Sequence, residues 1–149
     1  MTPSRYGDEF KVGDLHRTAA ITVTETHVVA WAGLTGDFYP LHMDREYAAK
    51  TQFGERLVHG PFIFALAVGL VAQAGFAGDA AIAWLGVDGM RMLAPVKIGD
   101  TVRVEVRVKE TRPTRNPRKG VQVWTYTVLN QRDEQVLVFD YQLMFHMRG

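Results

Sequence analysis

The second half of the chain alternates apolar and polar positions. Between residues 101 and 109 every second position is valine, and the positions between the valines are polar or charged. A period of two is typical of a strand that buries one face. Segment 137–147 alternates in the same way, 121–129 is rich in β-branched and aromatic residues, and 81–92 is a less regular candidate. The pattern predicts four antiparallel strands of roughly ten residues, each reaching about 33 Å.

A different pattern occupies residues 57–78, which contain no Lys, Arg, Asp or Glu. Pro61 follows Gly60, and proline is favoured in the first turn of a helix, so we predict a helix from Pro61 to about Ala74. Its apolar residues occupy every face, so the rest of the protein must enclose it. The segment is long enough for a bilayer, but polar residues and glycines interrupt it and no excess of Lys or Arg flanks it. We therefore predict a buried helix.

A sheet that curls around one fully apolar helix buries its own inner face and the whole helix. The chain of 149 residues shows no repeat or linker, and this length suits one domain. The sequence thus predicts an α+β hot-dog fold over residues 1–149, with a long curved antiparallel sheet wrapped around a central apolar helix. The order of the strands does not follow from the pattern.

The first half of the chain carries helix signals and a break. Thr24 is a predicted N-cap of a helix that Gly36 ends. Pro40 interrupts helical continuity, so we predict a loop at 37–44. Asp44 is predicted to cap a short helix that follows it.

Composition removes several classes of function. Lys and Arg number 17 against 16 Asp and Glu, a net charge of +1, so we expect no nucleic-acid partner. The chain has no cysteine and therefore no thiolate nucleophile, disulfide or Cys-ligated metal. The N-terminus has no apolar stretch of signal-peptide length, so we expect a cytoplasmic protein with no membrane partner.

Asp37 and His42 are the first candidate chemical groups. They lie five residues apart across a segment that contains a proline. A carboxylate and an imidazole that face one pocket can together bind and deprotonate a water molecule. The alternative is a turn-forming Asp and a half-buried, hydrogen-bonded His.

The segment His59-Gly60-Pro61, at the start of the apolar helix, is the second candidate. Glycine lets a ligand approach the backbone, and an amide at a helix N-terminus can serve as an oxyanion hole for a thioester or ester carbonyl. The alternative is a tight turn at Gly60 with His59 capping or packing. His42, Asp44 and His59 could also be metal ligands, but the nearby prolines are expected to fix unrelated backbone directions, so we predict no metal.

A basic segment connects two of the predicted strands. Residues 111–120 hold four cations and no acid. Because arginine binds phosphate through paired hydrogen bonds, we expect Arg115, Arg118 and Lys119 to bind the phosphates of a cofactor or substrate arm. A solvated hairpin loop is the alternative.

The motif Gly36-Asp37-Phe-Tyr-Pro40-Leu-His42-Met-Asp44, with His59-Gly60 downstream, resembles the MaoC-like dehydratases. This hot-dog family includes the (R)-specific enoyl-CoA hydratases. The resemblance continues through Ala94-Pro95-Val96, Gly99-Asp100 and Asn130-Gln131, and it covers nearly the whole chain from residue 10 onward.

The resemblance implies a hydro-lyase that adds water reversibly to a trans-2-enoyl-CoA and gives a 3-hydroxyacyl-CoA. Asp37 and His42 would activate the water that adds to C3, and the Gly60 amide would hold the thioester oxygen. The resemblance also implies a homodimer or a higher homo-oligomer and no organic cofactor or metal, because coenzyme A arrives as part of the substrate. The residues expected to line the substrate pocket are Tyr39, Pro40, His59 and Phe62.

Two positions depart from the family pattern. Many members have Asn where this chain has Tyr39, and some hydratases have Ser where it has Val68. With a bulky residue before the proline, this sequence looks more like the branch of the family that acts on small branched or dicarboxylic acyl-CoAs of the mesaconyl or itaconyl type. A second carboxylate would need a cation, for which Arg56 and Arg91 are candidates.

Two other functions fit the same fold. A hot-dog acyl-CoA thioesterase usually carries its carboxylate on the central helix, and this helix has none between Pro61 and Gly75. A non-catalytic acyl-CoA-binding subunit would not need the intact pair of Asp37 and His42.

Overall fold

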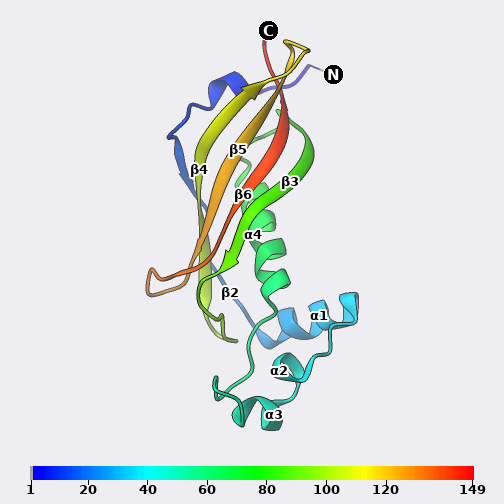
Figure 1. Ribbon diagram of the computed structural model, residues 1–149, viewed down its shortest axis with the longest axis vertical. Coiled ribbons are helices and arrows are strands. Elements are labelled where there is room, and N and C mark those ends of the chain that lie inside the picture. Colours follow the sequence, from blue (N-terminus) through cyan, green and yellow to red (C-terminus); the bar gives the residue numbers. More distant parts are fainter. Residues whose placement is uncertain (1) are drawn as a thin grey trace.

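The structure, a computed structural model, describes residues 2–149 and has a long curved antiparallel sheet with one helix along its concave face (Figure 1). This is the predicted α+β hot-dog arrangement. In chain order the elements are η1 (Gly7–Glu9), β1 (Leu15–Arg17), β2 (Ile21–Thr22), α1 (Glu25–Thr35), α2 (Pro40–Met43), α3 (Arg45–Ala49), α4 (Gly60–Ala74), β3 (Ala81–Met92), β4 (Thr101–Pro113), β5 (Lys119–Leu129) and β6 (Gln135–His146).

The strands follow the order β1-β4-β5-β6-β3, and the short β2 pairs separately with β4. All pairings are antiparallel, and β5 and β6 pair from Lys119 opposite His146 to Leu129 opposite Gln135. Strand β3, whose alternation was the least regular, shows three register shifts against β6. It ends the strand order, so one of its edges has no neighbouring strand within residues 2–149.

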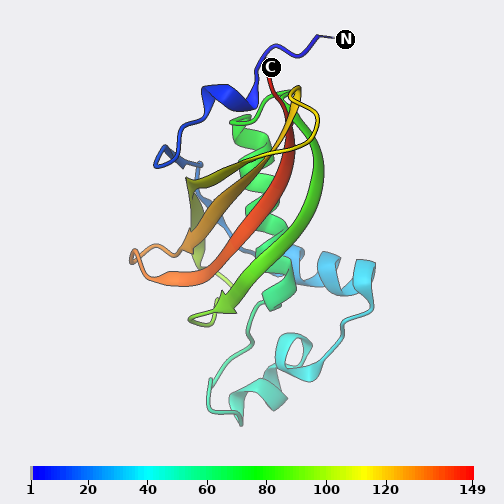
Figure 2. The same ribbon diagram turned by 45° about the horizontal axis from the view of Figure 1, so that its top comes forward.

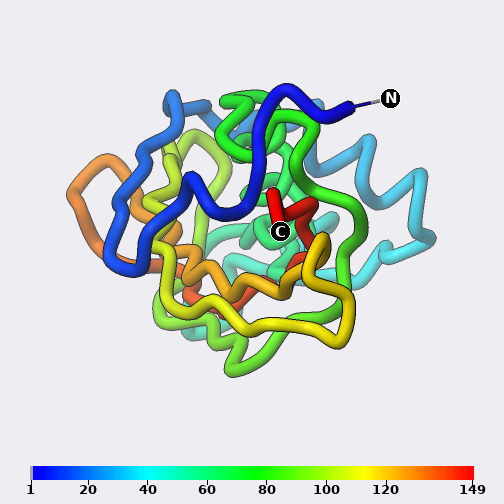
Figure 3. Tube along the Cα trace, turned by 90° about the horizontal axis from the view of Figure 1, so that it is seen from above, coloured from blue at the N-terminus to red at the C-terminus, as the bar shows by residue number. Residues whose placement is uncertain are grey.

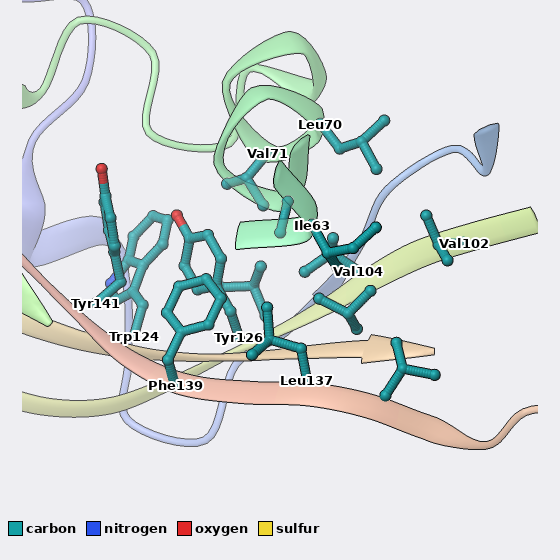
Figure 4. Packing of buried hydrophobic residues seen from close by; sticks show 14 of the residues in the cluster. Ile63, Leu70, Val71, Val102, Val104, Trp124, Tyr126, Leu137, Phe139 and Tyr141 are labelled. Atoms are coloured by element: carbon teal, nitrogen blue, oxygen red, sulfur yellow. The ribbon is translucent and has the colours of Figure 1, made fainter. Parts of the chain in front are cut away.

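Helix α4 and the inner face of the sheet form the core. Figure 4 shows Ile63, Leu70 and Val71 of α4 above the sheet, with Tyr126 and Phe139 among the side chains that face them. The alternating valines of β4 are all buried, as their period of two predicted. Helix α4 has 15 residues and is about 22 Å long. No helix among the described residues has both the length and the apolar character that a membrane crossing requires.

The first half of the chain forms α1, α2 and α3, which gather at the end of the sheet where α4 begins (Figure 2). Thr24 caps α1, and Gly36 ends it in the left-handed conformation at φ 80°, as predicted. The Asp44 carboxylate accepts a hydrogen bond of 2.9 Å from the Tyr47 amide at the start of α3. The prediction of a loop throughout 37–44 is wrong: Pro40 is the first residue of α2, where its missing N–H costs nothing.

Both ends of the chain lie at the other end of the sheet, the end that carries the hairpin between β4 and β5 (Figure 1). Seen from above, the N-terminal segment and this hairpin lie on opposite sides of the C-terminal end (Figure 3). There the Arg148 amide donates a 2.6 Å hydrogen bond to the Asp8 carboxylate. Ser4 donates hydrogen bonds from its amide and hydroxyl to Asp79, and these bonds lower the pKa of the Asp79 carboxyl. The two candidate regions, the start of α4 and the basic hairpin, are therefore at opposite ends of the molecule.

Candidate active site

Three segments that are distant in the sequence meet where α4 begins. Asp37 follows the C-terminal glycine of α1, His42 lies on α2, and His59 directly precedes Gly60, the first residue of α4. The chain reaches this place because Gly36 turns it back from α1 and Pro40 starts a new helical turn at once. The predicted pair of Asp37 and His42 is thereby brought to the start of α4.

Two backbone carbonyls fix the tautomers of the two histidines. Nδ1 of His42 lies 2.8 Å from the carbonyl oxygen of Leu57, and Nε2 of His59 lies 2.9 Å from that of Asp37. A carbonyl oxygen only accepts, so each of these nitrogens carries the proton. In the neutral rings, Nε2 of His42 and Nδ1 of His59 are left as acceptors.

The two imidazoles are in contact with tilted planes, and the Asp37 carboxylate lies near them. The ring centroids are 4.1 Å apart with the planes tilted by 30°. One nitrogen of each ring and one carboxylate oxygen of Asp37 all lie within 4.8 Å of one another. His59 is fully buried, and its Nδ1 has no hydrogen-bond partner among the described protein atoms. The three side chains can therefore share one small bound group.

The nearby prolines were expected to fix unrelated backbone directions, which argued against a shared site. His42 and His59 are in contact, and the carboxylate that joins them belongs to Asp37. Asp44, the carboxylate of the ligand set that was considered from the sequence and set aside, is the N-cap of α3.

A groove beside His42 leads to the start of α4. It has a volume of about 350 Å³. Its lining residues, which are apolar apart from one imidazole, are His42, Phe53, Leu57, Val58, Gly60, Met92, Leu93, Ala94, Pro95 and Val96. As the first residue of α4, Gly60 has an amide without an intrahelical partner, and the positive end of the helix dipole adds to its field. A Cβ at this position would come within 3.6 Å of Met92, so glycine keeps the groove open beside the amide.

The four residues expected to line the pocket lie in different places. Tyr39 is exposed, with its ring 6.0 Å from that of His42, and a hydrogen bond with its hydroxyl raises the pKa of Tyr47. Pro40 is exposed at the start of α2. His59 lies buried behind His42, and neither it nor Phe62 lines the groove.

Phe62 faces α1 instead of the groove. Its ring lies 5.7 Å from the rings of both His27 and Trp31. It therefore holds α1 against the first turn of α4. His27 also completes the cap of α1, because its Nδ1 accepts a 2.9 Å hydrogen bond from the Thr24 amide.

Arg56 has hydrogen-bond partners that the sequence did not reveal. Its guanidinium donates to the His42 carbonyl oxygen at 2.6 Å and to the Glu25 carboxylate at 2.9 Å. The side chain therefore ties α1 to α2 and does not point its charge into the groove. Arg91, the other candidate cation, is exposed on the edge strand β3.

The structure does not bring the basic hairpin to Gly60 within one chain. Gly60 lies next to Met92 of β3. Met92 and Val128 of β5 both pair with the same residue of β6, so they lie at the same level of the sheet. Val128 and Lys119 are nine residue steps apart along β5, a distance of about 30 Å at 3.3 Å per residue. Arg115, Arg118 and Lys119 thus lie at the far end of the sheet (Figure 1).

Sequence reasoning missed part of the groove. Phe53, Met92 and Leu93 come from two separate segments, and no local pattern shows that they share a wall. The carbonyl oxygens of Asp37 and Leu57, which fix the tautomers, also carry no signal in the sequence. The groove, the acceptor nitrogens and the free helix amide together can bind a carbonyl compound and activate a water molecule next to it.

Comparison with known proteins agrees with this geometry. The sequence profile of the MaoC like domain matches residues 10–130. The chain is 41% identical over 105 residues to Protein MaoC of Klebsiella aerogenes, covering 70% of this chain and 31% of that protein. It is 34% identical over 110 residues to the 3-hydroxybutyryl-CoA dehydratase of Methylorubrum extorquens, covering 74% of this chain and 68% of that enzyme.

A solved structure extends the likeness to almost the whole chain. The X-ray structure of a monoamine oxidase regulatory protein from Archaeoglobus fulgius superposes with a TM-score of 0.92 at 34% identity. The alignment covers 97% of this chain and 96% of that one. This chain corresponds to only about a third of the Klebsiella protein, whereas it spans the archaeal protein almost completely. The profile match and the shared architecture show that the chain belongs to the MaoC-like dehydratase family.

Proposed function

We propose that the protein is a hydro-lyase that adds water reversibly to a trans-2-enoyl-CoA thioester to give a 3-hydroxyacyl-CoA. One observation carries the proposal: the Asp37 carboxylate and a ring nitrogen of His42 lie within 4.8 Å of each other, and His42 lines an apolar groove together with Gly60, the first residue of α4. Family membership supports it, as does the name of the Methylorubrum relative, a 3-hydroxybutyryl-CoA dehydratase.

The proposed mechanism uses three groups of the chain. Asp37 and Nε2 of His42 bind the water, and Asp37 takes one of its protons as the oxygen adds to C3. The electron pair of the C2–C3 double bond moves to the thioester oxygen, where the Gly60 amide and the α4 dipole stabilise the negative charge. The enolate then takes a proton at C2 through the pair of Asp37 and His42, which returns both groups to their starting states. No metal or organic cofactor takes part in the proposed reaction.

The groove favours a small apolar acyl group. Phe53, Met92 and Leu93 supply apolar walls, and the lining residues include no Lys or Arg. Arg56, which precedes the lining residue Leu57, is engaged with Glu25 and the His42 carbonyl oxygen. We therefore propose a short or branched acyl group in preference to the dicarboxylic alternative. A panel of crotonyl-, longer enoyl-, mesaconyl- and itaconyl-CoA tests this. Fastest hydration of the mesaconyl or itaconyl substrate, or of long straight chains, would contradict it.

We propose that the functional unit is a homodimer joined through β3. The exposed apolar residues on or next to this free edge are Ile82, Trp84, Leu85, Met90, Met92 and Leu93. A free edge strand with apolar side chains is a site for association, and most homodimers are two-fold symmetric. Replacing Trp84 by Glu is expected to shift the mass measured by light scattering from dimer to monomer. A wild-type monomer at assay concentrations would refute the dimer.

The proposed dimer gives the basic hairpin a function. Two-fold antiparallel pairing of β3 places the Ala81 end of one copy beside the Met92 end of the other. The hairpin lies at the Ala81 end, because Ala81, Phe145 and Gly120 are level across the sheet. The hairpin of the second copy would then lie level with this chain's Gly60, where it can bind the phosphates of coenzyme A.

Purified protein mixed with an enoyl-CoA tests the proposed reaction. We expect loss of the enoyl thioester absorbance together with formation of the 3-hydroxyacyl-CoA. Release of free thiol, detected with a thiol reagent, would indicate a thioesterase instead. No change in either signal would indicate a binding subunit. A cytoplasmic location belongs to the same proposal, and cell fractionation tests it.

A further inference from the structure

We propose that Asp37, His42 and His59 also form a binding site for a divalent transition-metal ion of the zinc class, and that this ion inhibits the protein. The ion would take the place of the water that Asp37 and His42 hold. The inhibition rests on the proposed function, whereas the binding of the ion does not.

The orientation of the two imidazoles is the first argument. Metal-ligating histidines almost always donate their second ring N–H to a carbonyl, carboxylate or water, which fixes the tautomer and leaves the other nitrogen free for the metal. His42 and His59 both do this, to the carbonyl oxygens of Leu57 and Asp37. Each ring is therefore already in the tautomer that a metal needs.

The buried acceptor of His59 is the second argument. The side chain is 0% exposed, and its Nδ1 has no protein partner within the described part of the chain. Buried polar atoms nearly always have a partner, because an unsatisfied one costs free energy. The proposed mechanism gives this nitrogen no task, so its lone pair is available to a bound group.

The separation of the three ligand atoms is the third argument. Their ligand atoms lie within 4.8 Å of one another, whereas zinc bonds to nitrogen and oxygen of about 2.0–2.2 Å require separations nearer 3.4 Å. Asp37 and His42 are only half-buried, so rotations of their side chains can bring the ligand atoms the remaining distance of about 1.4 Å closer. His59 stays fixed by its burial and serves as the anchor.

The donor set indicates the kind of ion. Two imidazoles and one carboxylate suit zinc, cobalt and nickel, whereas magnesium and calcium prefer oxygen ligands only. Within residues 2–149 no other three His, Asp or Glu side chains converge in this way. The chain also has no cysteine to compete for the ion. Tight binding of one equivalent should therefore report on this site.

Occupation of the site would stop the proposed reaction. The metal needs the Asp37 oxygen and Nε2 of His42, which are the groups that bind and deprotonate the water. Coordination removes their lone pairs from that task. We expect activity to fall in proportion to occupancy and to return when a chelator removes the ion.

Titration of tag-free protein with Co²⁺ measures binding without reference to activity, since cobalt in a nitrogen and oxygen site has a characteristic visible absorption. We expect one equivalent to bind the wild type. Affinity should fall at least about tenfold in Asp37→Asn and in His59→Gln, while His146→Gln, a histidine at the other end of the sheet, should bind as the wild type does. Circular dichroism checks that each variant is folded. If His59→Gln is unstable, Asp37→Asn still tests the site, because asparagine preserves the volume of the side chain.

Enzyme assays in the presence of Zn²⁺ complete the test. The zinc concentration that halves activity should match the dissociation constant from calorimetry. Absence of stoichiometric cobalt binding, or equal binding by Asp37→Asn, would overturn the site. Activation by the ion would overturn the inhibition. If cobalt binds as expected but no enoyl-CoA is hydrated, the proposed function fails while the metal site stands.

Discussion

Replacing Gly60 by Ala separates the contribution of this residue to folding from its contribution to the proposed reaction. Gly60 is the first residue of α4, and its φ is not in the left-handed region, so alanine can adopt the same backbone. The new Cβ would lie 3.6 Å from Cγ and 3.8 Å from Sδ of Met92, which are ordinary contact distances. The substitution therefore introduces no clash in the folded protein.

The expected magnitudes follow from this geometry. Replacing glycine by alanine at a compatible position stabilises a protein by about 0.4–1 kcal/mol, because the unfolded chain loses entropy. For a domain of this size, 1 kcal/mol raises Tm by about 2–4 °C. The methyl group would also enter the groove beside the amide and move the thioester oxygen away from it. Since removal of one oxyanion donor costs about 10²–10³ in rate, we expect partial displacement to lower kcat/KM about 10- to 100-fold.

Thermal unfolding and steady-state hydration of an enoyl-CoA measure the two effects on the same preparation. Gly69→Ala is the matched control, because Gly69 is an exposed residue of the same helix and its Cβ would meet nothing within 4 Å. We expect both variants to keep or raise Tm and only Gly60→Ala to lose activity. Full activity in Gly60→Ala would contradict the placement of the thioester oxygen against this amide. A fall in Tm would contradict the inference that alanine fits this position.

Two further substitutions test the fold and the coenzyme site. Ile63→Ala removes a side chain that is 0% exposed where α4 meets the sheet, and urea unfolding should show a loss of about 2–5 kcal/mol; a loss below about 1 kcal/mol would contradict the central position of α4. Neutralising Arg115, Arg118 and Lys119 together to Gln should raise KM for the CoA substrate about tenfold and leave kcat unchanged, since phosphate contacts act on binding; an unchanged KM would refute the hairpin as the coenzyme site.

Local patterns in the sequence were sufficient for most of the elements. The alternating valines of β4 and the apolar run of α4 predicted their own burial, because each periodicity reflects which face meets the core. Pro40 was misinterpreted because proline both interrupts a helix and starts one, and only the turn at Gly36 shows which applies. Strand order depends on contacts between distant segments, so it was not predictable from periodicity.

The residue types of the candidate site were predictable from the sequence, whereas the directions of their side chains were less predictable. The sequence identified Asp37, His42 and Gly60; the first two converge with His59, and His42 and Gly60 line one groove. His59 was expected in the pocket, but its side-chain direction depends on where the 37–58 segment returns to α4, and it is buried against His42. The basic hairpin was matched to the substrate by charge alone, and charge does not reveal that a strand of about 30 Å separates it from Gly60.

The rate of crotonyl-CoA hydration by Asp37→Asn, compared with that of the wild type, tests the central claim most directly. Asn keeps the size of the side chain but cannot accept the proton, and general-base catalysis contributes about 10²–10⁴-fold. The account predicts measurable hydration by the wild type, a loss of turnover of that order in Asp37→Asn, and unchanged circular dichroism. Near-normal turnover by a folded Asp37→Asn would contradict the account.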